Sequence, residues 1–119
     1  MIRPAHDIPA VYLCREPIDM RKQIDGLATL VQYVLGQDPF SSQMYIFTNR
    51  ARDKIKILVW DRTGFVVWYK RLEEARFHWP KTGVGATLTI TGQQLNWLLD
   101  GYNLNAMIPH SALTYRAIA

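Results

Sequence analysis

Two stretches that flank a turn constrain the fold of this chain most strongly. Residues 53–60 and 65–72 are rich in β-branched and aromatic side chains, and Asp61-Arg62-Thr63-Gly64 separates them. Such stretches are typical of strands. Between them, aspartate can cap its own backbone and glycine can adopt a positive φ, as a tight turn requires. The pattern therefore predicts an antiparallel hairpin in which Trp60 lies opposite Phe65.

Side-chain alternation gives this hairpin two different faces. In the register set by the turn, Lys56 lies opposite Tyr69 and Lys54 lies opposite Arg71, so one face is basic and aromatic. The other face collects Ile55, Ile57, Val59, Val66 and Trp68. We expect this apolar face to pack on the first helix. Lys54 and Arg71 repel each other unless an anion lies over them, which is a mild indication of an acidic partner.

The remaining elements are predicted from periodicity and turn residues. Residues 11–14 and 87–90 read as short strands, and residues 44–49 as a third strand before the hairpin. Apolar residues from Met20 to Leu35 recur at helical spacing, with Asp19 as a plausible N-cap and Gly36 at the C-terminal left-handed position. Thr91-Gly92-Gln93-Gln94 matches a capping box that opens a second helix.

Together these elements predict an α+β fold. We expect an antiparallel sheet of about four or five strands, with a central meander, packed on one long N-terminal helix, and a second short helix near the C-terminus. The length of 119 residues fits one domain over residues 1–119. The tail, residues 102–119, has no recognisable period, and we expect it to be extended or poorly ordered.

Several classes of protein are excluded by composition. The chain is 49% hydrophobic and 20% charged, which is typical of a folded globular protein. No apolar run approaches the roughly 18 residues that span a bilayer, and the N-terminus is not of signal-peptide type, so we expect a cytoplasmic protein. A single cysteine, Cys14, and three scattered histidines give no disulfide and no spaced zinc ligands, so we predict no metal and no cofactor.

Positive charge is concentrated in the middle of the chain. Between Arg50 and Lys81 there are nine basic and four acidic residues, a net charge of +5, whereas the rest of the chain sums to −1. Cations interleaved with exposed rings suit phosphate contact and base stacking. The predicted nucleic-acid-binding residues are Arg50, Arg52, Lys54, Lys56, Tyr69 and Arg71. The alternative is a solvated sheet face, with rings that cover apolar neighbours and cations that lie along them.

Catalytic signals are weak by comparison. Asp53 and Asp61, with Glu73 or Glu74, would form a magnesium-dependent nuclease site only if they met, and the turn and strand start explain both aspartates better. Cys14 lies in a predicted buried strand, where thiols are usually inert. We therefore predict no catalytic residues and a protein that is not an enzyme.

The hairpin and its surroundings resemble one known family closely. The residues that carry the resemblance are Phe47-Thr48-Asn49-Arg50, Arg52-Asp53-Lys54-Ile55-Lys56-Ile57-Leu58, Trp60-Asp61, Gly64-Phe65, Trp68-Tyr69-Lys70-Arg71-Leu72-Glu73 and Phe77-His78-Trp79-Pro80. They resemble the small accessory protein called TnpB, or Orf2, of the sixty-six family of bacterial insertion sequences. The similarity extends over residues 8–101, and Ala75 stands where the family often has glycine.

The resemblance implies an accessory factor of transposition, encoded beside a separate and larger transposase, without catalytic residues of its own. Two hypotheses follow for its mechanism. In the first, the protein binds DNA through the basic hairpin face within a transposase complex. In the second, it is an assembly module that binds the transposase or a second copy of itself, with Trp60, Phe65 and Trp79 as anchors or through an unpaired sheet edge.

Overall fold

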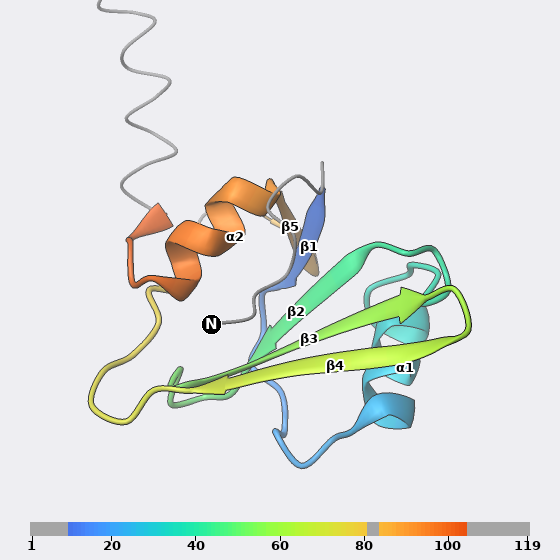
Figure 1. Cartoon of the computed structure of the whole chain (residues 1–119), viewed down its shortest axis with the longest axis horizontal. Coiled ribbons are helices and arrows are strands. Elements are labelled where there is room, and N and C mark those ends of the chain that lie inside the picture. Colours follow the sequence, from blue (N-terminus) through green and yellow to red (C-terminus); the bar gives the residue numbers. More distant parts are fainter. Residues whose placement is uncertain (1–9, 81–83, 105–119) are drawn as a thin grey trace, which may run out of the picture.

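A computed structural model describes residues 10–80 and 84–104 of the chain, which fold into one sheet with a helix on each side (Figure 1). The elements in chain order are β1 (Val11–Cys14), α1 (Ile24–Tyr33), β2 (Met44–Thr48), β3 (Lys54–Asp61), β4 (Gly64–Arg71), β5 (Thr87–Ile90) and α2 (Gly92–Leu99). The five strands form one sheet in the order β4-β3-β2-β1-β5.

The sheet is mixed, so the prediction of an antiparallel sheet was wrong. β1 pairs parallel with β2, with Val11 opposite Met44, while every other neighbouring pair is antiparallel. A parallel pair requires a crossover connection, and the segment between β1 and β2 that contains α1 supplies it. The apolar pattern of residues 11–14 predicts a buried strand, but it carries no information about the direction of that strand.

The hairpin has the predicted register. Lys54 pairs with Arg71, Lys56 with Tyr69 and Trp60 with Phe65. Its turn differs in one respect, because Arg62, with φ of 53°, adopts the left-handed conformation, whereas Gly64 does not. Gly64 instead pairs with Asp61 and begins β4.

The first helix is shorter than predicted. α1 has ten residues, and its N-cap is Gln23, whose side chain makes no capping hydrogen bond. Asp19, the predicted N-cap, lies five residues before the helix and instead accepts hydrogen bonds from the backbone and guanidinium of Arg21. Gly36 has φ of 66° just after the helix, which confirms its predicted left-handed conformation.

Both faces of the sheet are covered, and α1 lies on the face opposite to the predicted one. On one face, Leu27 and Val31 of α1 belong to a cluster with Tyr45, Phe47 and Leu58. This is the face that carries Lys54 and Lys56, which was expected to be open. The prediction failed because it considered only one covering layer, whereas β2 is buried along its whole length and needs two.

The second cluster joins the other face of the sheet to α2 and to residues 77–79. Ile55 and Ile57 of the hairpin pack there with Trp79, Leu95 and Leu98. The predicted capping box of α2 is confirmed: Gln94 N donates to Thr91 Oγ1 at 3.0 Å, and Thr91 N donates to Gln94 Oε1 at 2.8 Å. Within residues 10–80 and 84–104, neither helix has the length and apolar character needed to cross a lipid bilayer. Most of the predicted tail, from residue 105 on, lies outside the described residues.

Candidate nucleic-acid interface

One end of the sheet gathers basic residues from four parts of the chain. Because β1 and β2 are parallel, their C-terminal ends lie at the same end of the sheet, where β3 begins and β4 ends. Backbone bonds hold this end together: Ile18 N donates to Thr48 O at 2.8 Å and Phe77 N donates to Arg52 O at 2.7 Å. The basic residues there are Arg15, Arg50, Arg52, Lys54 and Arg71, and we refer to them as the basic end.

The turn between β2 and β3 is held rigidly by one side chain. Asn49 Nδ2 donates to Asp53 Oδ1 at 2.7 Å, while Asn49 Oδ1 accepts from the backbone N–H groups of Asp53 and Lys54 at 3.2 Å each. Arg52 has φ of 61°, a backbone conformation that residues other than glycine rarely adopt. This network fixes the backbone that carries Arg50, which is exposed, and Arg52, which is half-buried.

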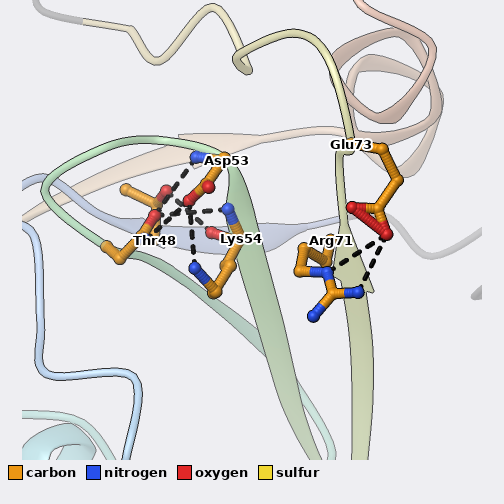
Figure 2. Close-up of polar contacts among 6 residues, drawn as sticks. Thr48, Asp53, Lys54, Arg71 and Glu73 are labelled. Carbon is orange, nitrogen blue, oxygen red and sulfur yellow. Dashed lines mark hydrogen bonds and ion pairs between the residues drawn. The ribbon is translucent and has the colours of Figure 1, made fainter.

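Two cations of the basic end form ion pairs with neighbouring carboxylates. Lys54 Nζ lies 3.4 Å from Asp53 Oδ1, and Arg71 Nη2 lies 2.9 Å from Glu73 Oε1 (Figure 2). The Asn49 amide lowers the pKa of Asp53, and the Glu73 carboxylate raises the pKa of Arg71. The chain's own carboxylates therefore relieve the repulsion between Lys54 and Arg71, so that repulsion no longer indicates an acidic partner.

Lys56 and Tyr69 lie further along the hairpin and are not part of the basic end. Lys56 Nζ donates to Met20 O at 2.9 Å and to Lys22 O at 2.8 Å, and it sits 5.8 Å from the centre of the Tyr69 ring. These bonds tie β3 to the segment before α1. Of the six residues predicted to bind nucleic acid, Lys56 is thus already engaged inside the fold, and Tyr69 is half-exposed beside it.

Arg15 joins the basic end, although the sequence analysis did not select it. A cavity of about 310 Å³ is lined by Arg15 and Arg52 together with Glu16, Pro17, Pro80, Val84 and Gly85. Arg15 follows β1 directly, and its backbone N–H donates to Ala86 O at 3.0 Å. Only the parallel pairing of β1 with β2 brings Arg15 to the same end as Arg52, and that pairing was not predicted.

The predicted interface aromatics separate into two groups. Trp60 and Phe65 lie beside the turn of the hairpin and contact each other with ring centres 5.0 Å apart. The ring centre of Phe40 lies 5.0 Å from that of Trp60 and 5.2 Å from that of Phe65. We call these three residues the ring cluster; Phe40, which sequence reasoning missed, is 57% exposed. Trp79 is instead 1% exposed, and its indole N–H donates to Cys14 O at 3.1 Å. Trp79 is therefore a core residue in this structure.

The residues considered for catalysis do not come together. Asp53 and Asp61 flank opposite ends of β3, about 25 Å apart at the usual rise of a strand. Within the described ranges, no three histidine, cysteine, aspartate or glutamate side chains are grouped in a way that could hold a metal ion. Cys14 is buried, its thiol donates to Glu16 O at 3.4 Å, and burial raises its pKa.

Comparison with known proteins identifies the family. The family model described as IS66 Orf2 like protein matches residues 9–108. The chain belongs to this family. This match confirms the resemblance found in the hairpin residues. IS66 Orf2-like proteins are accessory proteins of insertion sequences.

Two curated relatives of this IS66 Orf2-like chain come from Sinorhizobium fredii. One, named uncharacterized protein y4jC, is 28% identical over 101 residues, which is 85% of each chain. The other, named uncharacterized protein y4hO, is 34% identical over 91 residues, which is 76% of this chain and 78% of the relative. The search of solved structures found no match.

Proposed function

We propose that this IS66 Orf2-like protein acts in transposition without catalysing a reaction itself, and that it binds DNA through the basic end of its sheet. The observation that supports the proposal most is the convergence of Arg15, Arg50 and Arg52. Arg50 is exposed on a turn fixed by Asn49, and Arg52 shares a cavity with Arg15. A fixed backbone lowers the entropic cost of holding a guanidinium against a phosphate.

The chemistry of these side chains favours phosphate as the group that is bound. The guanidinium of arginine presents a planar fork of donors that matches phosphate oxygens. Lys54 and Arg71, which are paired with Asp53 and Glu73, add less to the local field than their number suggests. We therefore expect about two phosphate contacts, from Arg50 and Arg52, which correspond to a slope of about −2 in a plot of log affinity against log salt.

Titration of a labelled DNA duplex at several salt concentrations tests this proposal. Two substitutions at the basic end, Arg50→Ala and Arg52→Asn, should each weaken binding several-fold and reduce the salt slope by about 0.9. Asparagine is chosen at position 52 because it tolerates positive φ.

Arg62→Asn is the matched control. Arg62 has φ of 53°, close to the 61° of Arg52, and carries the same charge, but it lies in the β3–β4 turn at the other end of β3. It should leave binding nearly unchanged. A salt slope near zero for the unmodified protein, or an equal loss in Arg62→Asn and Arg52→Asn, would refute binding through the basic end.

A second function, in assembly with a protein partner, is supported by the ring cluster. Aromatic side chains concentrate binding energy at interfaces, and Phe40 exposes more than half of its surface next to Trp60 and Phe65. Here the transposase of the same element is the proposed partner. Phe40→Ala should reduce the amount of transposase that co-purifies with this protein. Tyr33→Ala, at a residue 76% exposed, should not reduce it. Equal recovery with both variants would count against the ring cluster.

A further inference from the structure

The long edge of the sheet offers backbone groups to a further strand. β4 lies at the end of the strand order, and within residues 10–80 and 84–104 its one neighbouring strand is β3. It has eight residues, Gly-Phe-Val-Val-Trp-Tyr-Lys-Arg, with neither a proline nor an acidic residue. Natural edge strands are usually short, or carry charges and prolines that prevent pairing. The central part of β4 has none of these features.

The hydrogen-bond pattern shows which residues face away from β3. Leu72 N donates to Asp53 O at 2.7 Å, which extends the β3–β4 ladder by one pair. In an antiparallel ladder, hydrogen-bonded pairs alternate along the strand, so Gly64, Val66, Trp68 and Lys70 bond to β3 in the same way. The outward-facing backbone groups therefore belong to the alternate residues, Phe65, Val67, Tyr69 and Arg71.

We propose that β4 pairs antiparallel with β4 of a second copy of this chain. A twofold axis perpendicular to the sheet satisfies the geometry, because it keeps each face on the same side and matches outward-facing residues with one another. The interface would extend the sheet across both copies. The inference stands independently of DNA binding.

The side chains favour an axis at Val67. In that register Val67 lies opposite Val67 of the second copy, Phe65 opposite Tyr69, and Val66 opposite Trp68. The two large hydrophobic side chains most exposed on β4, Val66 at 47% and Tyr69 at 49%, each gain an aromatic neighbour, and such cross-strand pairs are stabilising. Lys70 and Arg71 then face Gly64 and Thr63, so no like charges meet. Shifting the axis to Trp68 would place these cations opposite Val66 and Phe65.

Hydrogen exchange measured by NMR on the full chain tests the pairing directly. The amides of Val66 and Trp68 should be protected at every protein concentration, because they bond to β3. Those of Val67 and Tyr69 should exchange about tenfold more slowly, or slower still, once the concentration is high enough for dimers to form. Sedimentation should show twice the monomer mass over the same concentration range.

Two variants separate backbone pairing from side-chain effects. Tyr69→Pro removes an outward N–H without removing a bond to β3, and should give a monomer, whereas Tyr69→Thr keeps that N–H and should still dimerise. If Tyr69→Pro fails to fold, the exchange measurement on the unmodified chain decides. Free exchange of Val67 and Tyr69 at all concentrations would overturn the proposal. So would concentration-independent protection in a monomer, which would mean that another segment of the chain covers the edge.

Discussion

At the scale of single residues, local hydrogen bonds decide how polar side chains are used. Asp19 resembles a helix N-cap in the sequence, but its carboxylate accepts from Arg21 N at 3.0 Å and from Arg21 Nε and Nη2 at 3.0 Å and 2.7 Å. These bonds close a short loop before α1. A bidentate pair with arginine two residues away competes directly with capping, and residue type alone does not show which of the two will form.

The first prediction concerns the titration of Asp19. Hydrogen bonds from Arg21 lower its pKa from 3.8 to about 2. Because the folded protein favours the ionised form, this group stabilises the fold above pH 4 and loses that contribution as the pH falls from about 4 to about 2. Arg21→Gln should move the pKa back toward 3.8, which NMR titration of the Asp19 carboxyl carbon measures. An unchanged pKa in the variant would show that Arg21 is not the cause.

At the scale of elements, the two helices begin in different ways. α2 has a complete capping box of Thr91 and Gln94, whereas the side chain of Gln23, at the N-cap of α1, makes no capping bond. The backbone of Gln23 is already extended, with φ of −111°, as an N-cap requires. The start of α1 therefore lacks the side-chain cap that α2 has.

The second prediction follows from this missing cap. Gln23→Asp should place a carboxylate oxygen where it accepts a backbone N–H of the first turn, and should stabilise the protein by about 0.5–1 kcal/mol. Urea denaturation of the two proteins measures the difference. Gln32→Asp, at an exposed position late in the same helix, should not stabilise. A gain in both variants would point to a general charge effect instead of capping.

Elements whose signals are local were predictable from the sequence. The hairpin register, the strands at residues 44–48 and 87–90 and the capping box of α2 all depend on neighbours within a few residues. The direction of β1 depends on a crossover of some thirty residues, and neither periodicity nor turn chemistry specifies it. Two residues were not predicted from the sequence, Arg15 of the basic end and Phe40 of the ring cluster. Both reach their places only through such long-range packing.

At the scale of the whole molecule, the sheet lies between two helical layers and contributes to the apolar cluster on each of its faces. α1 covers one face and α2, with residues 77–79, covers the other, so the central strands contribute side chains to both clusters. Among residues 10–80 and 84–104, this leaves the ends of the sheet and its edge strands β4 and β5 without a covering helix, and α1 covers part of the hairpin face that was predicted to be open. The basic end and the ring cluster lie at opposite ends of the hairpin. In the proposed antiparallel dimer, the two basic ends would point in opposite directions.

The third prediction tests whether the two layers unfold together. Leu27 of α1 and Leu98 of α2 are both fully buried, one in each cluster. Replacing either by alanine should cost about 2–5 kcal/mol, because each leaves a cavity against the same sheet. In each variant, the helical signal in circular dichroism and the NMR signal of the Trp79 indole N–H should then be lost in one transition with one midpoint.

Trp79 makes this test informative, because it belongs to the Leu98 cluster and lies across the sheet from Leu27. If the sheet couples the layers, Leu27→Ala must shift the loss of Trp79 burial as far as it shifts the loss of helix. A helical signal that melts first in Leu27→Ala, while Trp79 keeps its original midpoint, would show that α1 unfolds separately. Tyr33→Ala, on the exposed face of α1, controls for helix propensity, since it removes a side chain that is 76% exposed.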